Sequence, residues 1–270
     1  MEKADSLQVI NDYWSREGLG QTILDSLIAS GKRLDALTIE DLAPVDQFHN
    51  GGIQATTELA ELAKISQGAR VLDVGGGVGG PARTLATLFG CKVTSIDLTE
   101  SYVQAAEILT DRIGLGGQVK HFVGNALELP FDDGAFDVVW TQQSCMNIRD
   151  KERLYEGFNR VLAPGGTLVF QEFMAGPVQP PIFPVMWAQD DSTSFLRAPD
   201  EMRELIESIG FRARVWEDVT ADTQRPGAPD PEHSIAALVM GEDLPAIRLA
   251  SKRNDEEGRI VRVRAVFERP

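Results

Sequence analysis

The sequence has few cysteines, few histidines and no long run of apolar residues. Cys91 and Cys145 are too few for a disulfide framework or a structural zinc site, so both are expected to be ordinary core residues. No stretch approaches the roughly 18 apolar residues of a membrane span, and residues 1–5 do not begin an apolar leader. We therefore expect a cytoplasmic protein without a membrane segment.

Basic residues are scarce relative to acidic ones. The chain of 270 residues has 26 Lys and Arg against 41 Asp and Glu, which gives a formal net charge of −15. Such a charge disfavours binding to nucleic acid or to an acidic lipid surface. Hydrophobic residues make up 43% of the chain, enough for the core of one large domain or of one domain with an added lobe. The expected partner is a small molecule, and composition leaves a homo-oligomer open.

The most informative stretch is a glycine-rich turn. A short apolar run at residues 71–74 is typical of a buried parallel strand. Gly75, Gly76 and Gly77 then allow the backbone to turn sharply into a helix that begins near Pro81. Gly75, Gly77 and Gly80 also fit the G-x-G-x-x-G spacing of dinucleotide sites, so the glycines do not identify the ligand by themselves.

Two carboxylates beside this turn narrow the choice of ligand. Asp73 lies at the end of the first strand, where its charge would disfavour a pyrophosphate and favour a ligand with a cationic amino group. Asp97 ends a second apolar strand, twenty positions after Gly77, where a carboxylate can accept hydrogen bonds from both ribose hydroxyls. A nucleoside with an amino group therefore fits better than a nicotinamide dinucleotide.

Five short motifs follow one another along the chain, at residues 73–79, 96–98, 124–131, 136–139 and 160–166. In this order they resemble the motifs of class I S-adenosylmethionine-dependent methyltransferases, and the resemblance covers about residues 45–220. Phe48 and His49 ahead of the glycine turn, with Asn147 after the fourth strand, are similar to one small-molecule branch. That branch contains sarcosine/dimethylglycine, phosphoethanolamine and tocopherol methyltransferases.

Strands and helices alternate along the middle of the chain, which predicts a parallel sheet covered by helices on both faces. The resemblance implies a doubly wound, Rossmann-like α/β fold whose seven-stranded sheet ends in a C-terminal antiparallel hairpin. Helical periodicity at residues 6–17 and 21–30 predicts an N-terminal helical cap over residues 1–47. The methyltransferase domain is expected over residues 48–270, with a lid insertion at about 175–198.

Two further elements are expected outside the motifs. A helical turn should begin at Thr38, with Asp41 as a weak capping box, and end at Pro44. A loop with Pro226, Pro229 and Pro231 should lead into one long helix over about residues 232–252.

The resemblance implies S-adenosyl-L-methionine as the cofactor and no metal. Asp73 and the glycine turn should hold its amino acid end, Asp97 its ribose, and Leu98 its adenine ring. Asn125 should accept a hydrogen bond from the adenine amino group through its amide oxygen. The expected cofactor-binding residues are Phe48, Asp73, Gly75, Gly76, Gly77, Asp97, Leu98, Asn125, Ala126 and Gln142.

Methyl transfer from a sulfonium is an in-line displacement with a good leaving group, so it depends on proximity, orientation and desolvation. This chemistry explains why no Ser/His/Asp triad and no metal-ligand spacing are found. The expected catalytic residues are His49, Gln143 and Asn147, with His49 orienting a ligand or accepting a proton. Asn147 matches the position where phosphoethanolamine methyltransferases carry a catalytic histidine, so that base is missing here.

The irregular segment at residues 175–198 is rich in proline, aromatic residues and methionine, and is expected to be a wall or lid of the acceptor pocket. The expected acceptor-binding residues are Trp14, Phe183, Met186, Trp187 and Phe195. The predicted activity is methylation of an N, O or C nucleophile of a small molecule. The alternatives are a cofactor-binding protein or non-methylating cyclase of the same fold, and a nicotinamide-dependent oxidoreductase. The acceptor itself cannot be identified from sequence.

Overall fold

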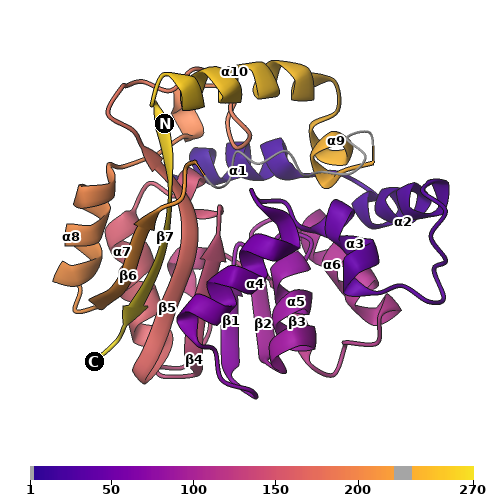
Figure 1. Cartoon of the computed structure of the whole chain (residues 1–270), viewed down its shortest axis with the longest axis horizontal. Coiled ribbons are helices and arrows are strands. Elements are labelled where there is room, and N and C mark those ends of the chain that lie inside the picture. The colour runs from indigo at the N-terminus through magenta and orange to yellow at the C-terminus, as the bar shows by residue number, and fades with distance from the viewer. Residues whose placement is uncertain (1–2, 222–232) are drawn as a thin grey trace.

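The computed structural model describes residues 3–221 and 233–270, which form a sheet with helices on both faces (Figure 1). The α-helices are α1 (Lys3–Trp14), α2 (Leu19–Ala29), α3 (Ile39–Asp46), α4 (Gly52–Ala63), α5 (Gly80–Phe89), α6 (Glu100–Arg112), α7 (Lys151–Val161), α8 (Pro199–Ser208), α9 (Ile235–Met240) and α10 (Leu244–Glu256). The strands are β1 (Arg70–Val74), β2 (Lys92–Asp97), β3 (Val119–Val123), β4 (Phe136–Gln142), β5 (Leu162–Ala175), β6 (Arg212–Asp218) and β7 (Ile260–Glu268). Short 3-10 helices include η1 (Ala126–Glu128), η2 (Cys145–Asn147) and η3 (Asp191–Thr193).

The seven strands lie in the order β3-β2-β1-β4-β5-β7-β6. Strands β1 to β5 are parallel, and Asp73 at the centre of the sheet pairs with Ser95 on one side and Trp140 on the other. Strand β7 is antiparallel to both β5 and β6, which confirms the expected antiparallel pair at the C-terminal end of the sheet. The strand order reverses between β1 and β4, and open α/β sheets bind ligands at such a switch point.

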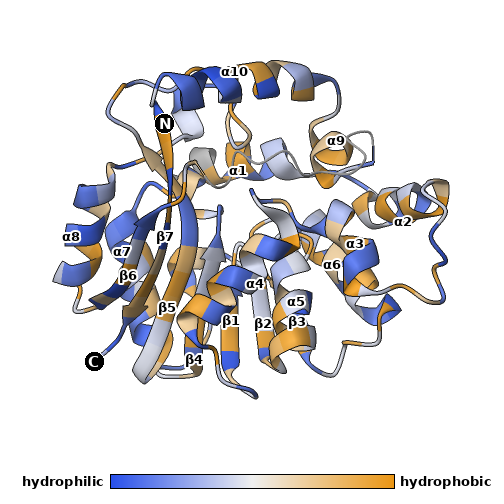
Figure 2. Ribbon diagram, in the orientation of Figure 1, coloured by the Kyte–Doolittle hydropathy of each residue, from blue (hydrophilic) through white to orange (hydrophobic). Residues whose placement is uncertain are grey.

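Side chains that alternate along the central strands build a core on each face of the sheet. Leu72 and Val139 pack with Phe158 of α7 on one face. Val71 packs with Leu85 of α5 in a separate cluster on the other face. Apolar residues accordingly gather on the strands, while the outer surface of α8 is largely hydrophilic (Figure 2).

Helix α1 lies across the end of the sheet, between the sheet and α10 (Figure 1). The Tyr13 hydroxyl donates to the Met186 carbonyl at 3.1 Å, and the Arg16 Nε donates to the Val239 carbonyl at 2.8 Å. These bonds connect the end of α1 to the irregular segment at residues 176–198 and to α9. In the described part of the chain, no helix is long and apolar enough to cross a membrane.

The prediction of one helix over residues 232–252 is wrong. Two helices occupy this region, α9 and α10, with a short 3-10 turn between them. Gly241 has a φ of +51°, a left-handed conformation that stops α9, and Pro245 lies in the first turn of α10, where no intrahelical N–H is needed. The expected start at Glu232 and the loop prolines lie outside the described residues.

The prediction that Pro44 ends its helix is also wrong, because α3 continues to Asp46. The capping box itself is present: the Asp41 N–H donates to the Thr38 hydroxyl, and the Thr38 N–H donates to the Asp41 carboxylate. In so short a helix, proline removes few backbone hydrogen bonds, and packing of the buried Leu42 and Val45 holds the last turn.

Candidate functional site

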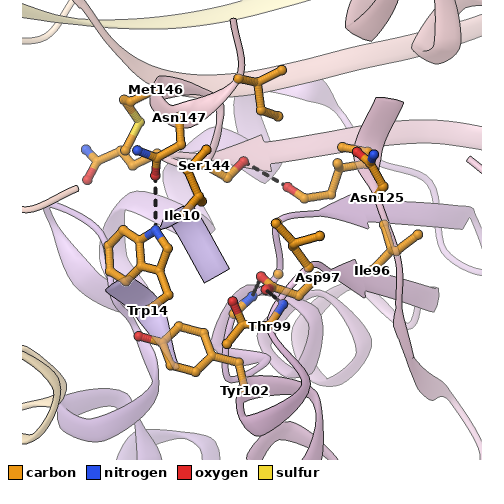
Figure 3. Close-up of a pocket in the computed structure, with 18 of the residues that line it drawn as sticks. Ile10, Trp14, Ile96, Asp97, Thr99, Tyr102, Asn125, Ser144, Met146 and Asn147 are labelled. Atoms are coloured by element: carbon orange, nitrogen blue, oxygen red, sulfur yellow. Dashed lines mark hydrogen bonds between the residues drawn. The ribbon is translucent and has the colours of Figure 1, made fainter. Parts of the chain in front are cut away.

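A pocket of about 730 Å³ lies at the carboxyl ends of β1, β2, β3 and β4, beneath α1. Figure 3 shows Trp14, Met146 and Asn147 on one side of it and Ile96 and Asn125 on the other. The strand ends supply one half of the lining, and α1 with η2 supplies much of the other. Its size is that of a small-molecule site.

The glycine turn after β1 forms the floor of the pocket, and its backbone requires glycine. Gly75 and Gly77 have φ values of +71° and +54°. A Cβ on Gly76 would lie 2.0 Å from the Ser95 hydroxyl oxygen and 2.7 Å from Oδ2 of Asp73. A side chain on Gly76 would therefore collide with these protein atoms beneath the turn, so only glycine lets the backbone pack this closely on the strand ends.

Asp73 lies directly beneath this turn. Its side chain is buried, and Oδ2 has no hydrogen-bond partner among the described residues. Burial raises the pKa of Asp73 to about 7; the charge of Asp97 adds to the rise and Arg83 opposes it. A cationic group reaching Oδ2 would favour the ionised carboxylate.

Asp97, at the end of β2, is held by two backbone donors. Its Oδ2 accepts from the Gly77 N–H and its Oδ1 accepts from the Thr99 N–H, both at 2.9 Å. Burial raises the pKa of Asp97, and these two N–H groups oppose the rise. The carboxylate is fixed at the pocket wall with further lone pairs available to ligand hydroxyls.

The remaining residues predicted for the cofactor also line the pocket, including Leu98, Ala126 and Phe48. The Asn125 amide oxygen accepts from the Leu127 N–H at 2.9 Å, so it caps η1 and has one lone pair left for a ligand. The structure therefore brings nine of the ten predicted cofactor residues together at the pocket, while Asp73 lies beneath the glycine turn and does not line it.

The His49 ring lines the pocket but is already engaged. Its Nε2 lies 3.0 Å from the Gln47 amide oxygen and 3.1 Å from the Thr56 hydroxyl, and its Nδ1 lies 3.3 Å from the Asn50 carbonyl. Burial lowers the pKa of His49 to about 4, so the ring is neutral near pH 7. This arrangement suits a rigid wall better than a proton acceptor.

The two glutamines at the end of β4 differ in their surroundings. The Gln142 amide oxygen accepts from the Thr56 hydroxyl and from the Trp140 indole, which holds it in the network around His49. Gln143 has a φ of +54°, which is unusual for a residue other than glycine. Its Oε1 accepts from the Asn50 N–H, while its buried Nε2 has no partner among the described residues.

Asn147 acts as a structural clamp. Its Nδ2 donates to the carbonyls of Trp187 and Thr193, at 2.9 and 2.7 Å, and its Oδ1 accepts from the Trp14 indole N–H at 3.0 Å. Both amide hydrogens are used, so Asn147 connects α1, η2 and the 176–198 segment and has little capacity left for a ligand.

The predicted acceptor residues divide into two groups. Trp14 and Phe195 line the pocket. Phe183, Met186 and Trp187 do not, and their assignment to the pocket wall is wrong. Trp187 is 2% exposed and packs on Phe173 with ring centroids 4.7 Å apart, while Phe183 and Met186 are partly buried against the same cluster.

Sequence analysis did not identify Asp46 and Tyr102 as pocket residues. Both line the pocket, and both have a buried oxygen, Oδ1 of Asp46 and the Tyr102 hydroxyl, without a partner among the described residues. Burial raises the pKa of both groups, although Arg83, 2.9 Å from the Asp46 carboxylate, opposes the rise for Asp46. In the sequence, the place of Tyr102 in the first helical turn after Asp97 was the one feature that indicated a pocket residue.

Two buried charged side chains, Glu172 and Lys151, support the loop that carries Gln143 and Asn147. Glu172 on β5 accepts from the backbone N–H groups of Ser144 and Cys145, both at 3.2 Å. Lys151 donates to the carbonyls of Cys145 and Ile148. The path of this loop is therefore fixed by residues outside the pocket.

Comparison with known proteins agrees with this geometry. Residues 72–170 match the family described as a methyltransferase domain. A glycine/sarcosine/dimethylglycine N-methyltransferase of Actinopolyspora halophila is 36% identical over 49% of this chain and 23% of its own. A sarcosine/dimethylglycine N-methyltransferase of Halorhodospira halochloris is 28% identical over 69% of this chain and 66% of its own. The chain thus spans less than two thirds of each relative.

Two solved structures share the fold over nearly the whole chain. A geranyl diphosphate methyltransferase, in complex with GPP and sinefungin, has a TM-score of 0.72 and 18% identity, covering 98% of this chain and 100% of that one. The [4+2]-cyclase SpnF has a TM-score of 0.71 and 23% identity, covering 98% and 97%. At these identities the likeness concerns the fold alone.

Proposed function

We propose that the chain, whose residues 72–170 match a methyltransferase domain, is a class I methyltransferase that transfers a methyl group from S-adenosyl-L-methionine to a small molecule. The observation that carries this proposal is the unpartnered Oδ2 of Asp73 beneath a turn that only glycine can form. A buried acceptor of negative charge at this place fits an ammonium group and not a phosphate.

The polar atoms around the pocket fit the whole cofactor. Asp73 would attract its ammonium group by its charge from beneath the glycine turn, and the Nε2 of Gln143 would donate to its carboxylate. Asp97 would accept from the ribose, while Leu98 and Asn125 would contact the adenine. Each of these contacts would satisfy a group that the protein holds at the pocket, and leaving buried polar atoms unpaired costs about 1–3 kcal/mol each. When bound, the cofactor supplies a methyl group on a sulfonium, which needs no metal for displacement.

The surroundings of the reacting groups favour orientation over acid–base chemistry. Both nitrogens of His49 have partners and its pKa is about 4, so it would hold the pocket wall in place. Asn147 is occupied by the clamp to Trp14. The chain would therefore act by positioning an acceptor that is already nucleophilic, whether nitrogen, oxygen or carbon, and by excluding water.

A non-methylating cyclase is a second candidate, favoured by the fold shared with the [4+2]-cyclase SpnF. Its support is weaker, because both relatives compared in sequence are named as methyltransferases. A nicotinamide-dependent oxidoreductase is disfavoured by the charge of Asp73. The cytoplasmic location and the absence of nucleic-acid binding stay predictions from composition, which leaves a homo-oligomer open.

Calorimetric titration with S-adenosylhomocysteine tests the cofactor site. We expect the wild type to bind, Asp73→Asn to lose about tenfold or more in affinity, and Asp25→Asn on the exposed face of α2 to be unchanged. Equal affinity of all three proteins would refute the role of Asp73. Incubation with labelled S-adenosylmethionine and a metabolite extract then separates the two candidates, since binding without label transfer would favour the cyclase.

A further inference from the structure

The half of the pocket opposite the strand ends has an apolar lining. Its side chains come from α1, from η2 and its continuation, and from the end of the 176–198 segment. They are Leu7, Ile10, Trp14, Met146, Ile148 and Phe195. Figure 3 shows Trp14 bonded to Asn147, with Met146 on the same side of the pocket. A ligand here is surrounded by hydrocarbon and aromatic surface, which favours an apolar body.

Among the polar groups that border this half, Asn147 and His49 are already satisfied, while the Tyr102 hydroxyl beside Trp14 has no partner among the described residues. Asn147 uses both amide hydrogens and its oxygen within the protein, and the neutral His49 is held by Gln47 and Thr56. A small, highly charged acceptor would lose its water here and gain no charged partner from these groups in exchange. The apolar side chains and these neutral groups alone therefore offer no charge to pair with such an acceptor.

The charged side chains of the lining have partners, with one exception. Arg153 pairs with Glu128 at 3.0 Å, Asp46 pairs with Arg83, and Asp97 accepts from two N–H groups. The Asp150 carboxylate accepts from the Arg153 N–H and caps α7.

Arg149 is the exception. It lines the pocket and forms no ion pair within the described residues; its guanidinium lies over the Phe195 ring, 4.2 Å from the centroid. The ring holds the cation at the end of the apolar half without neutralising it.

We propose that the acceptor has an apolar body and one anionic end, a carboxylate or a phosphate. The body lies between α1 and η2, and the anionic end pairs with Arg149. This inference rests on the proposed function, because the strand-end half of the pocket is taken to hold the cofactor. Arginine suits the role, since its planar guanidinium can donate two parallel hydrogen bonds to either anion while it stacks on Phe195.

The test is calorimetric titration of the S-adenosylhomocysteine-loaded protein with four probes: decanoate, decyl phosphate, decyltrimethylammonium and sarcosine. Decanoate or decyl phosphate should bind, and Arg149→Gln should weaken that binding about tenfold while leaving S-adenosylhomocysteine affinity unchanged. Arg203→Gln on the exposed face of α8 is the matched control and should leave both affinities unchanged.

Three results would overturn the proposal: tighter binding of decyltrimethylammonium than of both anions, binding of sarcosine without either anion, or anion binding that Arg149→Gln does not weaken. Failure of S-adenosylhomocysteine to bind would refute the proposed function separately. In that event the same titrations of the unloaded protein still measure whether Arg149 recognises an anion with an apolar body.

Discussion

Asp73 should make the affinity for the cofactor depend on pH. Its pKa in the ligand-free protein is about 7, and an ammonium partner favours the ionised form. Below pH 7 the Asp73 carboxyl is mostly protonated, and it must lose this proton before it can pair with the ammonium group of the ligand. The affinity for the ligand should therefore fall as pH falls. From pH 8 to pH 6 we expect a loss of about tenfold in S-adenosylhomocysteine affinity, measured by calorimetry. A constant affinity over this range would show that Asp73 does not contact the ammonium group.

Asp97 should contribute through its hydrogen bonds to the ribose hydroxyls. Asp97→Ala removes the expected ribose acceptor and leaves the Gly77 N–H without its present partner. The expected cost is about 1–3 kcal/mol, or about tenfold to a hundredfold in S-adenosylhomocysteine affinity. An affinity within twofold of the wild type, in a variant whose circular dichroism is unchanged, would contradict the assignment.

At the scale of elements, the 176–198 segment stabilises the fold at Trp187. The indole is buried against Phe173 and donates to the Ser194 hydroxyl. Trp187→Ala should lower the free energy of unfolding by about 3–5 kcal/mol, because it leaves a cavity in a packed cluster. Urea denaturation measures this loss, and Phe195→Leu, which changes a pocket-lining ring, is the comparison. A small effect of Trp187→Ala on stability would restore its interpretation as a lid residue.

Local patterns allowed most of the fold to be predicted from sequence. Apolar runs with turns between them located the parallel strands, and the glycines with Asp73 and Asp97 located one half of the pocket. The orientation of Trp187 could not be predicted, because it depends on how an irregular segment without a repeating pattern folds back onto Phe173 of β5. The unpartnered hydroxyl of Tyr102 could not be predicted for a similar reason, since only the packed structure shows that none of the described residues reaches it.

The stability of the whole molecule should respond to the cofactor. A ligand that binds only the native state raises the unfolding temperature by mass action. S-adenosylhomocysteine should therefore raise Tm, by an amount that grows with its concentration, while NAD and NADP should not. The measurement is a thermal melt with each ligand at equal concentration. A shift with the nicotinamides alone would contradict the proposed cofactor.

The position of Trp14 in the pocket wall has an optical consequence. The chain has four tryptophans, and Trp140, Trp187 and Trp216 pack in the core clusters while Trp14 lines the pocket. Any occupant changes the polarity around this one indole, so the protein's own fluorescence emission should report it. The spectrum of the wild type minus that of Trp14→Phe isolates the signal. Unlabelled acceptors can therefore be screened by emission alone, before their chemical identity is known.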